Sequence, residues 1–276
     1  MASVINYAEA YQAAIAEAFY NESLFSQVLW NSPSNSFIKF NGAKHIQVPN
    51  LTIDQGRKDR ARATITTPVV NYSNDWEDYS LKFDRYWETL VDPLDVDETN
   101  MVTSIANITR YFNLQQKLPE MDRYMFSQLY KETNTKNPAA IHSEALTEAN
   151  ILEAFDSAMA DFDEARVPSN GRVLYVTPQV NKILKTAEAK NRSASIAGNG
   201  NLARTVYSLD DVQLVVVPSD LMQSDFDFTV GSIAKSDAQQ IDMLLIWNGA
   251  QIAPQKYSFV GMDAPSATTS GNYHYY

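Results

Sequence analysis

The feature that most constrains this chain is a long amphipathic pattern in its first half. Its period, mostly three or four residues, is that of one face of an α-helix. Read as one helix from Asp97 or Thr99 to about Thr133, it would be roughly 55 Å long, and Pro119 should kink or divide it. The apolar positions are Met101, Ile105, Ile108, Phe112, Leu118, Met121, Met125 and Leu129.

Four carboxylates stand just before this pattern and could belong either to a metal or acid–base site or to the start of the helix. A calcium loop that began at Asp95 would need glycine at its sixth position and glutamate at its twelfth, where the chain has Asn100 and Ala106. Carboxylates in a first helical turn favour the positive end of the helix dipole. We therefore interpret the four as a helix start and a negative surface: Asp92, Asp95, Asp97 and Glu98.

The region before the helix resembles a long β-hairpin with a charged tip. The stretch HIQVPNLTI alternates like a strand and is broken by Pro49, and strand signals resume at 63–70 and 79–90. Between them the tip has almost no apolar side chain, so it is either a solvated loop or an arm that contacts another subunit. Its basic residues are the candidate contacts: Arg57, Lys58, Arg60 and Arg62.

Charge is segregated between this tip and the segment that follows. Residues 44–62 contain five Lys or Arg and two Asp, whereas residues 75–98 contain nine Asp or Glu and two Lys or Arg. Complementary charges of this kind set register and encounter rate between subunits. We expect the acidic segment, including Asp92, Asp95, Asp97 and Glu98, to be an intersubunit surface.

The N-terminal residues 7–19 have a helical stripe of small and aromatic side chains, with Asn6 and Glu9 as a capping pair. Such a stripe can lie flat on another surface but can hardly form a core by itself. It predicts either a docking arm or an ordinary terminal helix that packs on its own domain.

The second half of the chain has an α/β pattern. Thr147 can cap a helix that runs to Ala165, and Pro178 can open a second helix. Strand-like runs occur at 172–176, 212–217 and 241–247, whereas residues 191–204 are nearly bare of bulky apolar side chains and predict a surface loop.

Several classes of site have no support in the sequence. The chain has no cysteine, which excludes disulfides and thiolate chemistry, and its three histidines are far apart. It contains no nucleophile elbow, phosphate loop, dinucleotide fingerprint or zincin motif. We therefore expect no enzyme activity, catalytic residue, metal or cofactor.

The overall charge and hydropathy suggest where such a chain acts. A net charge of −11 is opposite to that of a protein that coats nucleic acid, which needs a basic face. The sequence has no bilayer-length apolar run and no leader, so we expect a soluble protein that is not exported.

With the order of elements in view, the chain resembles the major capsid proteins of tailed bacteriophages, of the Hong Kong 97-type fold. Residues 84–132 (DRYWETLVDPLDVDETN through PEMDRYMFSQLYKE) resemble the end of the extended E-loop and the long spine helix of that family. Residues 148–185, VVVPSDLM and IDMLLIWNGAQIAPQKY resemble the family's A-domain. The resemblance covers nearly the whole chain.

This resemblance implies an α+β fold in five parts. They are an N-terminal arm (1–39), an E-loop (40–83), a P-domain with the spine helix (84–140), an A-domain (147–255) and a C-terminal segment that returns to the P-domain (256–276).

The resemblance also implies a function. Pentamers and hexamers of one chain would form an icosahedral shell that encloses double-stranded DNA without sequence-specific binding, assembled in the host cytoplasm and located in the virion. Portal, scaffolding and head-completion proteins would be its partners, and no membrane is involved. The alternatives are an encapsulin-like nanocompartment shell and, from another class, a monomeric metal-dependent enzyme that uses residues 92–98.

Overall fold

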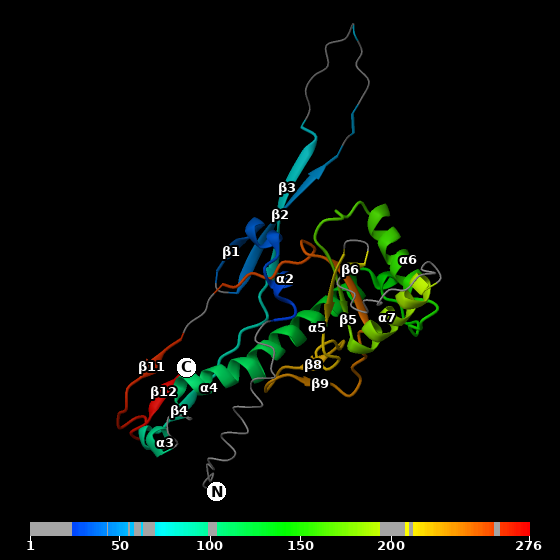
Figure 1. Cartoon of the computed structure of the whole chain (residues 1–276). Helices are drawn as coiled ribbons and strands as arrows, with labels where there is room; N and C mark the ends of the chain where they lie inside the picture. Colours follow the sequence, from blue (N-terminus) through cyan, green and yellow to red (C-terminus); the bar gives the residue numbers. More distant parts are fainter. Residues whose placement is uncertain are drawn as a thin grey trace.

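The molecule is elongated, with a mixed α/β body, a long hairpin that projects from it and a small sheet at the opposite end (Figure 1). The combination of helix and sheet expected from the sequence is confirmed. This computed structural model describes residues 24–42, 44–54, 56–57, 62, 70–98, 104–193, 208–209, 212–256 and 260–276. The predicted helix at 7–19 lies outside these residues.

The body is built on a four-stranded sheet in the order β10-β5-β7-β6. The central pair β5 and β7 is parallel, and the two outer pairs are antiparallel. Three of the strands coincide with the apolar runs predicted at 172–176, 212–217 and 241–247. The bounds are β5 (Arg172–Val176), β6 (Ser208–Leu209), β7 (Val212–Val216) and β10 (Met243–Trp247).

Helices cover both faces of this sheet, and the alternation of side chains along β5 divides the core between them. Val173 and Tyr175 pack with Met125 and Phe126 of α5 (Leu118–Lys136) and with Leu29 of α2 (Gln27–Trp30). On the other face, β5 packs against α6 (Ile151–Glu164) and α7 (Pro178–Ser193). All five residues of β5 are buried, so this strand is the centre of the body.

The predicted long helix is present, but it begins later than expected. It runs from Ile105 to Lys136 as α4 (Ile105–Phe112), a π-helical turn η2 (Asn113–Lys117) and α5. The π turn directly precedes Pro119, whose ring would clash with the carbonyl of Gln115 in a regular α-helix. The wider turn relieves that clash, so the helix continues through Pro119 where the sequence predicted a kink or a division (Figure 1).

Side-chain hydrogen bonds form at or just before the starts of α6 and α7. Residue Thr147, expected to cap α6, lies one turn earlier, where its N–H and hydroxyl both bind Oδ1 of Asn150, at 2.7 and 3.0 Å. Helix α7 begins at Pro178 as predicted, and the hydroxyl of Thr177 accepts a hydrogen bond from the Val180 N–H at 3.4 Å.

The projecting hairpin consists of two nine-residue strands, β2 (His45–Ile53) and β3 (Tyr72–Ser80), with β1 (Lys39–Asn41) at its base. The pairing runs from His45↔Ser80 to Ile53↔Tyr72. Strand β2 passes through Pro49 without the predicted break. Strand β1 pairs only as far as Gln47, so the side of β2 beyond it needs no donor from the proline.

The other strand predictions in this region were partly wrong. Residues 63–69 lie outside the described residues, and β3 forms from the polar sequence 72–80, of which only 79–80 belonged to a predicted strand. In the run expected at 79–90, only the ends are strand: residues 81–88 are extended but have no strand partner, and β4 (Thr89–Val91) follows them.

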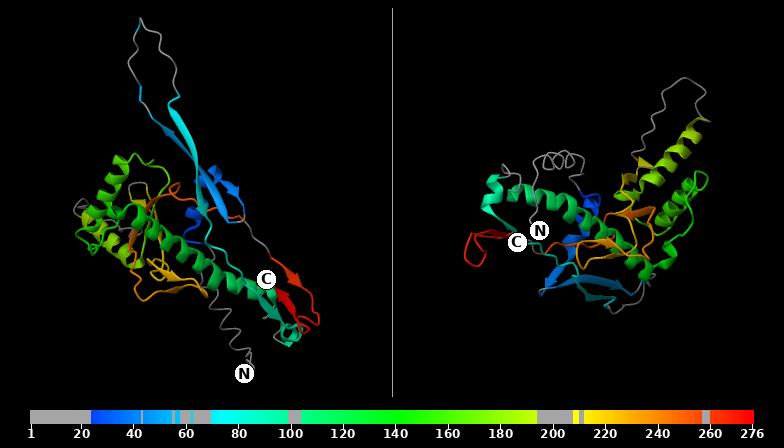
Figure 2. Two further views of the ribbon diagram at one scale, coloured as in Figure 1. Left: turned by 180° about the vertical axis from the view of Figure 1, so that it is seen from behind. Right: turned by 90° about the horizontal axis from the view of Figure 1, so that it is seen from below.

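The far end of the molecule brings the chain's tail beside the start of the long helix. Strand β12 (Tyr273–Tyr275) lies between β11 (Met262–Asp263) and β4, antiparallel to both. The short helix α3 (Pro93–Glu98) follows β4. Figure 2 shows this end and the hairpin tip pointing away from each other. The remaining elements are η1 (Pro33–Phe37), η3 (Pro138–Ala140), β8 (Phe226–Asp227) and β9 (Ile233–Ala234).

Candidate intersubunit surfaces

The shaft of the hairpin exposes large apolar side chains that have no core of their own. All nine residues of β3 are exposed, and in β2 only Ile46 is buried. A monomer loses the free energy of burying such side chains, about 1.5–3 kcal/mol each. The exposed set is Leu51 (63%), Ile53 (69%), Val70 (73%), Tyr72 (63%), Trp76 (44%) and Tyr79 (42%).

Sequence reasoning missed this apolar shaft. The sequence prediction placed the intersubunit contact at the charged tip. Most of β3 was not recognised as a strand, because its sequence, YSNDWEDYS, contains three acids. A signal was present: Tyr72 and Trp76 stand an even number of residues apart, which places them on the same face of a strand.

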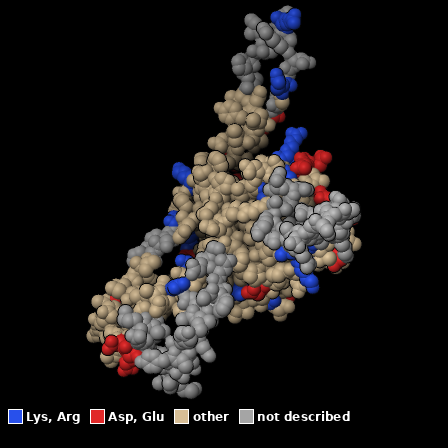
Figure 3. Space-filling model, viewed as in Figure 1, with Lys and Arg blue, Asp and Glu red and all other residues tan. Residues whose placement is uncertain are grey.

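The predicted basic tip lies at the outer end of the hairpin. Arg57 and Arg62 are among the described residues and both are exposed, whereas Lys58 and Arg60 lie outside them. Figure 3 shows the basic side chains of this end far from the acidic ones at the base of the molecule.

The predicted acidic cluster starts a helix only in part, and the helix is the short α3 and not the long one: Asp95 lies in the first turn of α3, whereas Asp97 and Glu98 are its last two residues. Asp92 caps α3: its Oδ1 accepts a hydrogen bond from the Leu94 N–H at 2.9 Å. Asp95, Asp97 and Glu98 belong to α3 itself, where Asp97 had been expected to cap the long helix. Among the described residues, no three His, Asp or Glu side chains form a group that could hold a metal ion.

The tip and the acidic helix α3 lie at opposite ends of one chain (Figures 1 and 3). Within a single molecule they therefore cannot neutralise each other. A contact between them requires a second copy, placed head to tail, and such heterologous contacts generate rings when the rotation closes.

The extended segment 81–88 connects the hairpin to the body by packing along the long helix. Phe83 stacks on Tyr124, with ring centroids 4.1 Å apart, and Trp87 stacks on Phe112, also at 4.1 Å. Phe83 and Trp87 are an even number of residues apart and face the same side of the segment, as the strand-like alternation in the sequence predicts. Its inward side chains contact a helix instead of a neighbouring strand.

Arg85, between these two aromatic residues, joins three elements. Its Nε lies 2.6 Å from Oε1 of Glu120 on α5. Its guanidinium also donates to the backbone carbonyls of Phe228 and Gly231, in and beside the β8–β9 hairpin. The outward residue of the same segment, Tyr86, is 87% exposed. The segment thus holds the root of the hairpin at a fixed position on the body.

The base of the hairpin has weaker contacts of its own. Lys44 and Asp84 form an ion pair at 3.1 Å, but both side chains are mostly exposed, so it contributes little. The Leu81 N–H donates to the Lys44 carbonyl at 2.7 Å. The hydroxyl of Tyr79 donates to Glu77 at 2.6 Å, and this hydrogen bond to a carboxylate is the main reason that the pKa of Tyr79 is raised.

The β8–β9 region is tied to the long helix by charge. Asp225 accepts from Lys131 of α5 at 2.5 Å and from Lys235 at 2.7 Å. Burial alone would raise the pKa of Asp225, but the hydrogen bonds from the two lysines hold it below its usual value. Arg123 reaches Asp220 at 2.8 Å and the Ser232 carbonyl at 3.0 Å.

The first described residues are anchored on a buried carboxylate of α5. Asp122 is 2% exposed and accepts hydrogen bonds from the N–H groups of Phe25 and Ser26, at 3.3 and 2.9 Å. Burial raises the pKa of Asp122, and these hydrogen bonds oppose the shift. Burial, with the nearby Asp122 charge, also raises the pKa of Tyr175.

Comparison with known proteins gives the context of this geometry. No family model matches the chain, and no curated protein matches it in sequence. Solved structures do match. A chain from Mycobacterium phage Che8 is 15% identical, with a TM-score of 0.54 over 92% of this chain and 84% of that chain.

Two further matches come from phage capsids. The mature capsid of bacteriophage PhiM1 is 15% identical, with a TM-score of 0.52 over 84% of this chain and 76% of that one. The capsid of cyanophage P-SCSP1u is 11% identical, with a TM-score of 0.52 over 86% and 78%. This chain shares their fold. The resemblance to phage capsid proteins is therefore confirmed at the level of the fold.

None of the described helices combines the length and the apolar character needed to cross a bilayer.

Proposed function

We propose that this chain is the major capsid protein of a tailed bacteriophage and assembles, through pentamers and hexamers, into an icosahedral shell around double-stranded DNA. The observation that carries the proposal is the exposed apolar hairpin shaft, from Leu51 and Ile53 to Tyr72 and Trp76. A monomer would leave this surface in water, whereas a neighbouring copy would bury it. The fold shared with the capsids of PhiM1 and P-SCSP1u supports the same function.

The proposal assigns the Hong Kong 97-type layout to the chain. The hairpin of β2 and β3 would be the E-loop (40–83), and the long helix would be the spine of the P-domain (84–140). The sheet of β5, β7 and β10 with its helices would be the A-domain (147–255). Pairing of β12 with β4 supports a tail (256–276) that returns to the P-domain, and residues 1–39 would be the N-terminal arm.

In the shell, we place the basic tip of one subunit on the acidic α3 of its neighbour. The tip contributes Arg57, Lys58, Arg60 and Arg62, and the acceptor surface contributes Asp92, Asp95, Asp97 and Glu98. The location of Arg57 and Arg62 at the opposite end of the chain from α3 supports a head-to-tail contact (Figure 3). Exposed ion pairs are weak singly, so their role is to set register while apolar burial supplies affinity.

The charge of the chain supports containment of DNA over binding of it. A protein that neutralised many phosphates would need clustered Lys and Arg, whereas this chain has a net charge of −11. The proposal therefore includes no sequence-specific DNA contact. It also includes no enzymatic activity, because the sequence offers no catalytic motif. Portal, scaffolding and head-completion proteins would be its partners, with assembly in the host cytoplasm and a final location in the virion.

The test is the mass and shape of the purified full chain. Sedimentation velocity followed by electron microscopy should show capsomers or megadalton shells in equilibrium with, or in place of, the 31.0 kDa monomer. A protein that stays monomeric at high concentration, alone and with a co-expressed scaffolding protein, would contradict the proposal. Nucleic acid inside the particles from infected cells separates a phage shell from an enzyme-enclosing compartment.

A further inference from the structure

Asparagine is followed directly by glycine at three places in the described part of the chain: residues 41–42, 170–171 and 248–249. In such a pair the backbone nitrogen of the glycine can attack the side-chain amide carbon of the asparagine, because glycine has no side chain to hinder the approach. In a folded protein, the attack also requires that the peptide group between the two residues be free to turn. The three pairs differ in this respect.

The pair Asn170–Gly171 is held by the end of β10. The Trp247 indole N–H donates to the Asn170 carbonyl at 3.1 Å, and the Asn248 N–H donates to the Gly171 carbonyl at 2.9 Å. A Cβ atom added at Gly171 would lie 2.7 Å from Oδ1 of Asn248. The peptide group between Asn170 and Gly171 can therefore turn only when this part of the structure opens.

The pair Asn248–Gly249 is held by contacts of the same kind. The Asn248 carbonyl accepts a hydrogen bond from Nε2 of Gln251 at 3.3 Å, and the Gly249 carbonyl accepts one from the Ser34 hydroxyl at 2.6 Å. A Cβ atom added at Gly249 would lie 2.4 Å from the ring of Trp247. This peptide group is likewise fixed in the folded chain.

The pair Asn41–Gly42 lies in open space at the root of the projecting hairpin. Asn41 ends the three-residue edge strand β1, and both residues of the pair are exposed. A Cβ atom added at Gly42 would meet no atom of the described residues within 4 Å. The Gly42 carbonyl accepts a hydrogen bond from Nζ of Lys256, which stands on a flexible four-carbon stem and can follow the turn as it moves.

We propose that Asn41 is a site of spontaneous intramolecular deamidation and that the fold protects Asn170 and Asn248 from the same reaction. The Gly42 nitrogen gives up its proton and bonds to Cγ of Asn41, while the bond from Cγ to Nδ2 breaks. Ammonia leaves with that proton. One water molecule from the solvent then opens the cyclic imide at either of its two carbonyls, which yields aspartate or isoaspartate.

Either product changes the root of the hairpin. Aspartate places a negative charge beside the ammonium of Lys256, which already contacts the Gly42 carbonyl and the ring of Phe40, and opposite charges attract. Isoaspartate adds one carbon to the main chain at the Asn41↔His45 pair, where the pairing of β1 with β2 ends. The inference concerns the single subunit and does not depend on shell assembly.

Peptide mapping of the full chain tests the proposal. The chain is kept at pH 8.5 and 37 °C, either folded in buffer or unfolded in urea, and is digested at mildly acidic pH before mass spectrometry. In the folded chain, Asn41 should react at least about tenfold faster than Asn170 and Asn248, which must first open locally. In urea only the shared Asn-Gly sequence remains, so the three rates should agree within about threefold.

Two results would overturn the proposal. Equal rates at the three positions in the folded chain would show that the fold protects none of them. A slower reaction at Asn41 than at Asn170 or Asn248 would show that the turn after β1 is the protected one.

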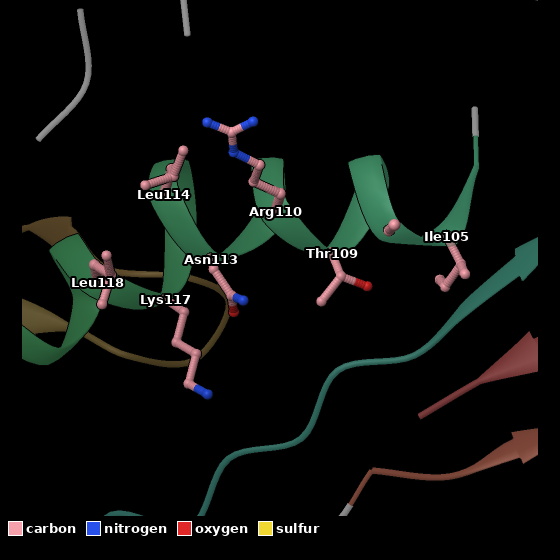
Figure 4. Close-up of a pocket in the computed structure, with 8 residues that line it drawn as sticks. Ile105, Thr109, Arg110, Asn113, Leu114, Lys117 and Leu118 are labelled. Atoms are coloured by element: carbon pink, nitrogen blue, oxygen red, sulfur yellow. The ribbon is translucent and has the colours of Figure 1, made fainter. Parts of the chain in front are cut away.

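Asn113 supplies a control for solvent access without glycine. It lines a shallow groove on the long helix, and its side chain projects from the helix (Figure 4). The next residue is Leu114, whose side chain crowds the attacking nitrogen. Asn113 should therefore react at least about tenfold more slowly than Asn41, both in the folded chain and in urea. Equal rates at Asn113 and Asn41 would contradict the proposed attack by the glycine nitrogen.

A substitution in β10 tests whether its contacts cause the protection. Trp247→Phe removes the indole N–H that holds the Asn170 carbonyl and the six-membered ring that packs on Gly249. The rate at Asn170 should rise at least about threefold, while the rate at Asn41 should not change. An unchanged rate at Asn170, in a chain with native circular dichroism, would refute the protection. An equal rise at Asn41 would show that this turn is also closed in the folded chain.

Discussion

The carboxylate of Asp122 binds Ser26 twice, accepting one hydrogen bond from its backbone N–H at 2.9 Å and one from its hydroxyl at 2.5 Å. This contact joins the N-terminal segment to the long helix across ninety-six residues of sequence. Because Asp122 is buried, the root of the segment is held by a group whose charge is costly to bury.

The raised pKa of Asp122 predicts how stability changes with pH. A group whose pKa is higher in the folded than in the unfolded state binds its proton more tightly when folded. Its contribution to stability is therefore fully present below the ordinary carboxyl pKa and decreases as the pH rises through the folded value. The difference in unfolding free energy between the wild type and Asp122→Asn should be larger at pH 4.5 than at pH 7.5.

Urea unfolding of both proteins at the two pH values measures this difference. Gln116→Ala in the long helix is the control, since Gln116 is exposed and neither side chain titrates, so the substitution should give equal differences at both pH values. A wild-type advantage that grows as the pH rises would reverse the predicted sign.

Arg85 and Glu120 should be energetically coupled. Their ion pair is partly buried, with 33% and 13% of the side chains exposed, and Arg85 also binds two carbonyls. Arg85→Ala should destabilise the chain by about 2–3 kcal/mol, because those acceptors lose a charged donor. A double-mutant cycle with Glu120→Gln should give a coupling of about 1–2 kcal/mol. Additive effects would show that the pair does not hold the segment.

Two isoleucines of β2 should separate folding from assembly. Ile46 is 5% exposed and Ile53 is 69% exposed on the same strand. Ile46→Thr should lower the unfolding free energy by about 2 kcal/mol, because it removes buried apolar volume and buries a hydroxyl. Ile53→Thr should change monomer stability by less than about 0.5 kcal/mol yet reduce particle yield. Normal yield from Ile53→Thr together with Tyr72→Ser would remove the shaft from the assembly interface.

Charge reversal at the tip should impair assembly without unfolding the subunit. The variant carries glutamate in place of Arg57, Lys58, Arg60 and Arg62, and particle yield is measured by sedimentation. A surface control reverses Arg166 and Lys182, which are exposed elsewhere on the body. Normal yield from the tip variant would refute the contact between the arm and its neighbour.

A compensating change makes the tip prediction specific. Adding Asp95→Lys and Asp97→Lys to the tip variant should restore part of the yield, because two lysines of α3 then face the glutamates of the tip and the charge of the four-residue acidic surface rises from −4 to zero. Asp92 is left unchanged, since it caps α3. Restoration by Asp156→Lys and Glu164→Lys instead, which add the same positive charge at exposed positions of α6, would point to net charge as the cause.

Local sequence determined most of the regular elements in the second half of the chain. Strand β5 and helix α7 are where the apolar run and Pro178 predicted them. The reason is that burial on two faces requires an uninterrupted apolar run, and a proline at the first helical turn costs no hydrogen bond. The long helix was predicted because its apolar side chains repeat every three or four residues, which places them on one face of a helix.

Tertiary structure decided the features on which the intersubunit surfaces depend. The side chains of residues 81–88 alternate as in a strand, but the inward ones contact the aromatic rings of Tyr124 and Phe112 on the long helix. Pairing along the whole of β2 makes a strand of the acidic segment 72–80. The alternation of side chains in the sequence predicts which of them face the body. It does not predict whether they pack against a strand or a helix, because that depends on contacts between residues far apart in sequence.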